Sequence, residues 1–232
     1  IAFGGALCAF GGLFLLANIW AAGCKGKENY TPPAWKPPHT DSTALPSITA
    51  DTSWPAAGVN AVTAFGDFNK SFLTVSGKYT FYKAALNNGE KDYFWQQALD
   101  IQMVEDYYRT KRSADVKTLI NNLLQTFLVQ NAGSGGLTDW SWNDYNDDLL
   151  WAGLAFVRGY EIVGDPAFLS QAKYAFDFLY ARGWDNQLGG GIWWDVKHAA
   201  KSGLSNNPAV ILSCYLYRFT GDTAYLNKAK AI

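Results

Sequence analysis

The sequence predicts an all-α protein, a ring of helical hairpins of the (α/α) barrel type. Apolar residues recur at helical spacing in successive segments along most of the chain. The stretch 164–173 is repeated at 221–230, with a weaker copy at 92–98, so that one repeat holds two helices and two connections. The repeat length varies, and the connections are long and rich in aromatic residues and glycine. These features disfavour an open solenoid such as a tetratricopeptide array, whose repeat is about 34 residues.

The expected helices follow one another from about residue 59 to the end of the chain. Gly164 stands where a C-cap is expected, and Asp165 precedes Pro166 as an N-cap precedes the first helical residue. A Gly-Asp pair recurs at 221–222. The periodicity predicts helices over about 59–75, 93–111, 114–130, 148–163, 166–181, 208–220 and from 223 onward.

Charge and composition narrow the classes of function. The 232 residues include 19 Lys and Arg against 20 Asp and Glu, a net charge of −1. This balance lacks the clustered positive charge that attracts nucleic acid, so we expect no nucleic-acid partner. Aromatic residues make up 16% of the chain, with 10 Trp. So many wide, flat side chains indicate either a large core or a surface that stacks on a flat ligand.

The first part of the chain resembles an export signal followed by a tether. No charged residue occurs before Cys24, and the apolar run 7–17 is followed by small residues that lead to this cysteine. We expect a bacterial lipoprotein-type signal over 1–24 with lipidation at Cys24; a transmembrane anchor is the alternative. The Pro- and Thr-rich stretch 25–56 is expected to be a tether, and 57–232 the domain. The protein would then be exported and lipid-anchored to the bacterial cell envelope, on its periplasmic or outer-surface side.

The end of the chain and its cysteines support further expectations. The last expected helix reaches Ile232 without a cap, a glycine or a polar tail, so we expect the ring to be incomplete in this chain. Half a ring leaves apolar helix faces uncovered, and we therefore expect residues 25–232 alone to be unstable or inactive. Beside Cys8 and Cys24, the sequence holds Cys214 in an apolar stretch, which predicts a buried, inert thiol.

The loop 137–148 gathers aromatic residues and carboxylates just before an expected helix. Asp147 and Asp148 lie side by side there, and one interpretation is that they cap the helix. Capping needs only one Asp, so the other interpretation is a catalytic pair in which repulsion raises one pKa and yields an acid and a base. Carboxyl groups on adjacent helical residues can lie about 5–6 Å apart, which suits a retaining glycosidase. The aromatic residues of this loop expected to contact a substrate are Trp140, Trp142 and Tyr145.

A second loop combines glycines with paired tryptophans. The glycine run 189–191 permits a tight turn, and Trp193 and Trp194 follow it. Such rings stack on the apolar face of a sugar or pack in a core, and both interpretations stay open. The residues around 192–194 have strand propensity, so we expect a small hairpin there. The polar stretch 201–207 either donates hydrogen bonds to hydroxyl groups or caps the next helix.

Other chemistries are poorly supported. Neither a Gly-x-Ser-x-Gly nucleophile motif nor a phosphate-binding P-loop occurs. His39 falls in the expected tether, which leaves His198 alone and speaks against a histidine-based zinc site. The acidic loop lacks the spacing and the central glycine of an EF-hand. We therefore expect no metal and no cofactor.

Three motifs together resemble glycoside hydrolase family 76, the bacterial and fungal endo-α-1,6-mannanases. The first is Asn-Asp-Asp-Leu-Leu-Trp at 146–151, and the second is Gly-Gly-Gly-Ile-Trp-Trp at 189–194. The third is Lys201 with Ser205 and Asn206. The motifs occur in the family's order and at similar spacing, which makes the resemblance specific.

The resemblance covers about 58–232 and implies a fold, an activity and site residues. The fold would be an (α/α)6 barrel of twelve helices, incomplete in this chain. The activity would be retaining, endo-acting hydrolysis of α-1,6-mannosidic linkages in α-mannan by a monomer, with Asp147 as nucleophile and Asp148 as acid/base. With the loops described above, the expected substrate-binding residues are Trp140, Trp142, Tyr145, Asn146, Trp193, Trp194, Lys201, Ser205 and Asn206.

Other functions stay open on the same scaffold. Ala152 and Gly153 stand where the family often has bulk, and 201–204 differs from the commoner Lys-Asn-Ala-Ile, so the subsites can differ in shape. A noncatalytic glycan-binding protein and a transglycosidase are alternatives that would use the same loops. Another alternative is a different barrel enzyme, such as an unsaturated glucuronyl hydrolase or a sugar epimerase, although epimerases typically use paired histidines.

Overall fold

The computed structural model describes residues 60–232. The expected signal with its lipidated Cys24 and the expected tether, residues 1–56, lie outside this part of the chain. Residues Ala64–Ile232 form one compact unit, which is the unit described below. Among residues 60–232, no helix combines the length and the apolar character needed to cross a membrane.

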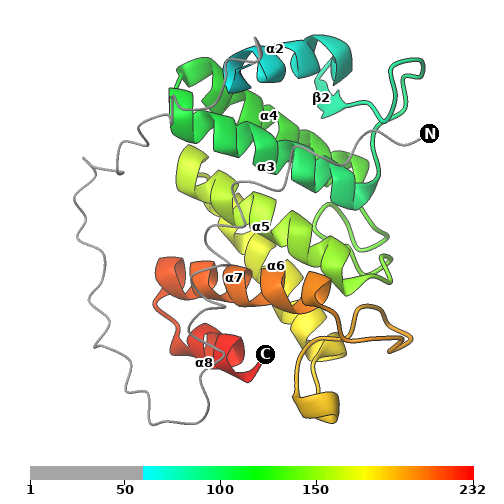
Figure 1. Ribbon diagram of the computed structural model, residues 1–232, viewed down its shortest axis with the longest axis vertical. Helices are drawn as coiled ribbons and strands as arrows, with labels where there is room; N and C mark the ends of the chain where they lie inside the picture. The colour runs from blue at the N-terminus through cyan, green and yellow to red at the C-terminus, as the bar shows by residue number, and fades with distance from the viewer. Residues whose placement is uncertain (1–59) are drawn as a thin grey trace. The chain divides into compact units, whose positions relative to one another are not determined.

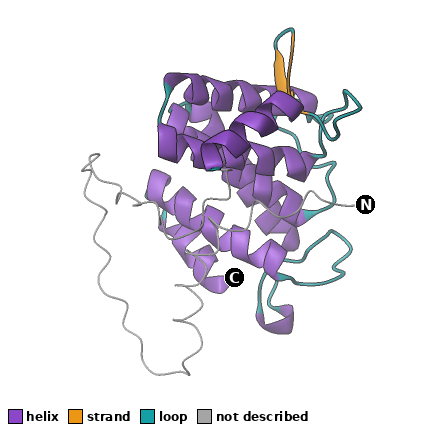
Figure 2. Cartoon of the chain, turned by 45° about the horizontal axis from the view of Figure 1, so that its top comes forward, coloured by secondary structure: helices purple, strands orange, loops and turns teal. Residues whose placement is uncertain are grey.

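Helices dominate the described residues, as Figures 1 and 2 show, and this confirms the all-α prediction. Two short antiparallel strands and a 3-10 turn are the other regular elements of residues 60–232. The helices are α2 (Ala61–Phe72), α3 (Phe94–Lys111), α4 (Ala114–Gln130), α5 (Asn146–Val163), α6 (Pro166–Gly183), α7 (Gly203–Thr220) and α8 (Thr223–Ala231). The remaining elements are β1 (Leu73–Ser76), β2 (Tyr79–Tyr82) and the turn η1 (Gln187–Gly189).

The helices are arranged as hairpins around the row α3, α5 and α7. Helix α5 packs against both α3 and α7, while α4 lies on α3 and α5, α6 on α5 and α7, and α8 on α7. The connections that precede α3, α5 and α7 emerge on one side of the unit, the right-hand side of Figure 1. We call this side the loop end; it is formed by 83–93, 131–145 and 184–202. The two loops that the sequence singles out therefore lie at the same end of the fold.

The helix boundaries explain the sequence repeat. The side chains of Asp165 and Asp222 each accept a hydrogen bond of 2.9 Å from the backbone N–H two residues on, and so cap α6 and α8. Gly164 and Gly221 end α5 and α7 with φ of 86° and 71°, a left-handed conformation that favours glycine. The repeated Gly-Asp pair is thus a C-cap followed by an N-cap, as expected.

A chain of aromatic rings forms the centre of the core. Trp140 is fully buried and meets Phe94, Phe127 and Phe156 edge to face, with ring centroids 5.2, 5.5 and 5.4 Å apart. Phe156 continues the chain to Phe168 at 5.6 Å. These rings come from α3, α4, α5, α6 and the loop before α5, so the core ties that loop to the helices.

Two glycines let α5 approach its neighbours closely. A Cβ atom at Gly153 would lie 2.5 Å from Leu212 of α7, and one at Gly159 would collide with Leu124 of α4. Neither glycine has a left-handed backbone, so the reason for glycine here is space. The central position of α5 in the helix row therefore depends on these two small residues.

Replacing Gly159 with Ala is expected to destabilise the fold by about 1–3 kcal/mol, because the added methyl group forces Leu124 to move in a packed core. The matched control is Gly66→Ala in α2, where a Cβ meets nothing within 4 Å. That change is expected to stabilise the helix by about 0.5–1 kcal/mol. Thermal unfolding followed by circular dichroism compares the two variants, and equal midpoints would contradict this packing.

The first helix and the last cysteine differ from expectation. The helix expected over about 59–75 stops at Phe72, because the following residues form β1 and pair with β2. The chain turns between the two strands at Gly77, where φ is 59°. Apolar residues in a short strand fit a helical pattern equally well, which explains the error. Cys214 was expected to be buried; its side chain is exposed in this structure, although partial burial raises the pKa of its thiol.

The region between α6 and α7 also differs from expectation. The hairpin expected around 192–194 is reduced to isolated bridges, which pair Trp184 with Ile192 and Trp193 with Lys201. Helix α7 begins at Gly203 and not near Pro208, because the Ser202 carbonyl accepts the first N–H groups of the turn. The polar stretch before Pro208 is therefore largely helical.

Candidate active site

The two adjacent aspartates lie in the first turn of α5, at the loop end. The N-cap residue of α5 is Tyr145, and it makes no side-chain capping bond. Asp147 and Asp148 follow inside the helix, so neither is the N-cap. The N-cap role therefore does not account for the pair, although hydrogen bonds from backbone N–H groups of this first turn also reach the carboxyl group of Asp147. The positive end of the helix dipole favours their ionised forms.

The two carboxyl groups experience different environments. Burial raises the pKa of Asp148 to about 6, with a smaller upward contribution from Asp147, and a hydrogen bond of 3.0 Å from Asn143 Nδ2 opposes the rise. Burial also raises the pKa of Asp147, while a hydrogen bond from the side chain of Trp194 lowers it and the nearby Asp195 raises it. One oxygen of Asp147, Oδ1, is buried without a hydrogen-bond partner among the described residues. The pair thus offers a carboxylic acid that titrates near neutral pH beside a carboxylate with a free oxygen.

Asn146 joins the second loop, 184–202, to the start of α5. Its backbone N–H donates to the Trp194 carbonyl at 2.8 Å, and its Nδ2 donates to the Trp193 carbonyl at 2.7 Å. Its Oδ1 accepts from Arg182 Nε at 2.7 Å. The side chain is fully buried with its amide groups engaged, which corrects the expectation of a substrate contact. Asn146 instead fixes this second loop beside Asp147.

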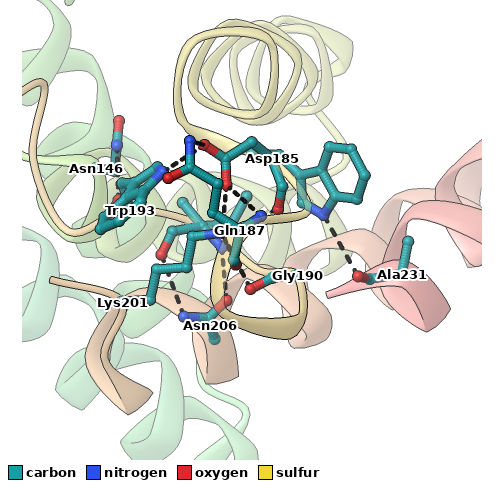
Figure 3. A network of polar contacts seen from close by, with 10 residues as sticks. Asn146, Asp185, Gln187, Gly190, Trp193, Lys201, Asn206 and Ala231 are labelled. Atoms are coloured by element: carbon teal, nitrogen blue, oxygen red, sulfur yellow. Dashed lines mark hydrogen bonds and ion pairs between the residues drawn. The ribbon is translucent and has the colours of Figure 1, made fainter. Parts of the chain in front are cut away.

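Lys201 holds the second loop together around its glycine run, 189–191. Its Nζ donates to Asp185 Oδ1 at 2.6 Å and to the carbonyls of Asp185, Gln187 and Gly190 at 2.9, 2.8 and 3.1 Å, as Figure 3 shows. An ammonium group has three protons, so these acceptors saturate it. The Lys201 side chain is 7% exposed. It is therefore a clamp inside the loop and not the free donor that we expected.

Trp193 belongs to the same clamp. Its indole Nε1 donates to Asp185 Oδ2 at 2.8 Å, and its ring stacks on His198 with centroids 4.8 Å apart. The hydrogen bonds from Lys201 and Trp193 lower the pKa of Asp185 to about 2, so this carboxylate stays ionised. Trp193 is buried, which differs from the expected stacking surface.

The third motif is also occupied by loop contacts. Asn206 Oδ1 accepts from the Ile192 backbone N–H at 2.7 Å, and its Nδ2 donates to the Ile192 and Ser202 carbonyls at 3.2 and 2.8 Å. A Cβ at Gly191, where φ is 97°, would lie 2.5 Å from Asn206 Oδ1, so this close approach requires glycine. Ser205 is fully buried. Both residues were expected to bind substrate, and both shape the loop instead.

Three aromatic residues of the expected set have rings at the loop end that are not fully buried. Trp142 is 50% exposed and Tyr145 is 44% exposed, while Trp194 is partly buried. The rings of Tyr145 and Trp194 lie 5.1 Å apart. Trp140 was expected beside them, but it lies in the core. Tyr93 and Trp95, which no sequence motif singled out, are exposed at the equivalent start of α3.

Sequence reasoning also missed three polar residues that hold the aspartate pair or the second loop in place: Asn143, Arg182 and Asp185. Asn143 and Asp185 lie within the two loops singled out, and their positions near the motifs were the available signal. Arg182 carried no such signal, because a cation in the last turn of α6 is typical of any helix end. Among residues 60–232, no group of three His, Cys, Asp or Glu side chains is placed to hold a metal ion.

The sequence profile of glycosyl hydrolase family 76 matches residues 61–232. The chain belongs to this family. No protein of curated function matches the chain. Family membership agrees with the resemblance carried by the three motifs, and it identifies the helical hairpins as part of the family's (α/α)6 barrel.

Solved structures of family 76 share the fold. The α-1,6-mannanase from Salegentibacter sp. HEL1_6 is 26% identical with a TM-score of 0.61, covering 73% of this chain and 48% of that one. An inactive variant of that mannanase, in which two consecutive aspartates are replaced, is in complex with an α-1,6-linked mannotetraose. A protein from Listeria innocua is 24% identical with a TM-score of 0.62, covering 73% and 49%. The chain spans about half the length of these structures.

Proposed function

We propose that the protein is a glycoside hydrolase that cleaves α-1,6-mannosidic linkages within α-mannan chains with retention of configuration. The observation that carries the proposal is the partly buried Asp147–Asp148 pair in the first turn of α5, with exposed aromatic rings beside it. Membership of family 76 and the mannanases among its structural relatives support the substrate class.

The two aspartates take different roles in the proposed reaction. Asp147 acts as nucleophile, since its Oδ1 has no hydrogen-bond partner among residues 60–232 and the Trp194 side chain favours its ionised form. Asp148 acts as acid and then base, because its pKa of about 6 keeps a proton available close to neutral pH. Carboxyl groups about 5–6 Å apart are suited to a retaining enzyme.

The reaction then runs in two displacements. Asp147 attacks C1 of the mannose, and the bond from C1 to the bridging oxygen breaks as Asp148 donates its proton to that oxygen. In the second step, water gives a proton to Asp148 while its oxygen attacks C1, which breaks the ester to Asp147. The product has the α configuration of the substrate, and both carboxyl groups return to their starting states.

The exposed rings of Trp142 and Tyr145 and the partly buried ring of Trp194 are the proposed stacking surfaces for mannose. The apolar face of a pyranose packs on an aromatic ring, and these rings lie at the same end of the fold as the aspartates. Tyr145 is the residue directly before α5, so a sugar stacked on it lies next to the start of the helix. These three residues remain from the expected substrate-binding set once the buried members are set aside together with Lys201 and Asn206, whose polar atoms are engaged in loop contacts.

The proposed function is tested by incubating the protein, expressed from its complete reading frame, with linear α-1,6-mannan, branched α-mannan and β-1,4-mannan. We expect a series of manno-oligosaccharides from linear α-1,6-mannan and none from β-1,4-mannan. Binding without cleavage would favour a noncatalytic glycan-binding protein. Products longer than the starting oligosaccharide, formed with an added acceptor, would favour a transglycosidase, and release of mannose alone would contradict endo action.

The reaction is expected to lose rate as the pH rises above about 6. The pKa of Asp148 is raised from 3.8 to about 6, so its protonated form persists up to about pH 6 and is lost above it. The acid limb belongs to protonation of Asp147, whose pKa is also raised. The pH dependence of kcat/KM measures both limbs, which are macroscopic values of the pair. A rate that stays constant from pH 5 to 8 would contradict the role of Asp148.

A further inference from the structure

Asn143 is held in a single orientation by its surroundings. It lies in the turn between Trp140 and α5 and is 5% exposed. Its backbone N–H donates to the Trp140 carbonyl at 3.1 Å, and its Oδ1 accepts from the Tyr145 backbone N–H at 2.9 Å. A backbone N–H can only donate, so the amide oxygen must face Tyr145. The Nδ2 group therefore has to point the other way.

The partner of Asn143 Nδ2 is Asp148, whose Oδ2 lies 3.0 Å away. The carbonyl oxygen of a neutral carboxyl group is a better acceptor than its hydroxyl oxygen, so a hydrogen bond from the amide to Oδ2 favours the proton on the other oxygen. When Asp148 is neutral, its proton therefore sits on Oδ1. The amide thus selects one of the two carboxyl oxygens as the one that delivers the proton.

Arg182 holds Asn143 from the opposite side. Its Nη2 donates to the Asn143 carbonyl at 2.8 Å, and its Nε donates to Asn146 Oδ1 at 2.7 Å. The guanidinium also lies over the Phe178 ring, 4.8 Å from the centroid. Because a guanidinium donates from a rigid plane, these two bonds fix the turn relative to the start of α5. Arg182 comes from the end of α6, so three segments meet at this contact.

We propose that Asn143 is a positioning residue for Asp148, which directs the acid/base proton to Oδ1, and that Arg182 holds Asn143 in place. The catalytic part rests on the proposed function, whereas the effect of Asn143 on the protonation of Asp148 does not. Nothing in the family motifs assigns either residue. Asn143 would act through its hydrogen bond to Asp148 and not through a contact with the sugar.

The charges around Asp148 define what loss of this donor does. Asp147 is the neighbouring charge that raises the pKa of Asp148, while Asp195 from the second loop acts on Asp147. Arg182 contacts the Asn143 backbone and Asn146. A donated N–H favours the carboxylate form, so it opposes the effects of burial and of Asp147. Removing the donor must then raise the pKa of Asp148 above its present value.

Two variants separate the donor from the turn. In Asn143→Ser, the hydroxyl group can still accept the Tyr145 N–H, but it is too short to reach Asp148. In Asn143→Asp, the turn acceptor is kept and the donor becomes an acceptor with negative charge. The matched control is Asn122→Ser, an exposed asparagine on α4. Carbon-13 NMR of labelled aspartate carboxyl groups in the complete protein, assigned with Asp148→Asn, follows the titration of Asp148 directly.

We expect the pKa of Asp148 to rise by about one unit in Asn143→Ser and further in Asn143→Asp, and to stay unchanged in Asn122→Ser. An unchanged titration in Asn143→Ser would overturn the proposal whether or not the protein cleaves mannan. In an active enzyme, the basic limb of kcat/KM should move upward by the same amount. If the pKa of Asp148 measured by NMR moved while the basic limb of the kcat/KM profile stayed in place, the catalytic part of the proposal would be overturned. Absence of cleavage by the wild-type protein would contradict the proposed function alone.

Discussion

Replacing Asp147 with Asn is expected to lower the turnover of α-1,6-mannan by about a thousandfold or more, because an amide cannot form the ester to C1. The substitution keeps the size of the side chain, and Asp147 is not the N-cap residue of α5. The effect should therefore fall on kcat with unchanged thermal stability. Initial rates on α-1,6-mannan, measured with the complete protein, test this result.

Replacing Asp148 with Asn gives a second, distinguishable loss. General acid–base catalysis contributes about 10²–10⁴-fold, so turnover of mannan should fall by that factor. The leaving group of an aryl mannoside with an acidic phenol needs no protonation, so the first step can still proceed in Asp148→Asn. Added azide should then attack the mannosyl ester in place of water, which restores turnover and yields α-mannosyl azide. The control is Asp144→Asn, an exposed carboxylate in the same loop, which should change rates by less than about threefold. Full turnover in either Asp147→Asn or Asp148→Asn would remove the pair from the mechanism.

Replacing Trp140 with Ala is expected to destabilise the protein by about 3–5 kcal/mol, the largest stability effect that we predict. Its ring is 0% exposed and contacts three phenylalanines edge to face, so the change leaves a cavity at the centre of the core. The cavity also frees the turn that carries Asn143, whose N–H donates to the Trp140 carbonyl. Denaturant unfolding of the complete protein measures the loss.

Trp142→Ala is the matched comparison for Trp140→Ala. Trp142 lies two residues further on, is half exposed, and anchors its indole to the Asn131 carbonyl at 3.2 Å. Its removal should cost about 1 kcal/mol of stability and should weaken substrate binding by stacking loss. If the two variants were equally unstable, or if Trp140→Ala changed only KM, the division of the tryptophans into core and surface would be wrong.

The parts of the fold that could be predicted from sequence are those fixed by local chemistry. Gly164 and Asp165, with their repeat at 221–222, mark helix ends because a left-handed C-cap and a side-chain N-cap depend on single residues. Helical periodicity placed α3 to α6 within a few residues. The strand pair after Phe72 was missed, since a strand of four residues with only Leu73 and Val75 apolar is too short to be distinguished from a helical pattern.

The sequence predicts where the site lies but not which role each of its residues has. Adjacent aspartates before an aromatic loop mark Asp147 and Asp148 without any structure. The partners of Lys201 are mostly backbone carbonyls, and their directions depend on the positive φ angles of 188–191, which no sequence pattern reports. Polar residues near a site can therefore hold the loop as easily as they bind the ligand. Asn146, Ser205 and Asn206 are of this kind.

The proposed mechanism depends above all on Asp147 becoming covalently attached to the sugar. The most direct measurement is to trap the intermediate in the complete protein with a fluorinated mannosyl substrate whose second step is slow, and to map the modified peptide by mass spectrometry. We expect a mannosyl ester on Asp147, and none in Asp147→Asn. A label on Asp148, Asp195 or another carboxylate would contradict it, as would an enzyme that releases the β-configured product first.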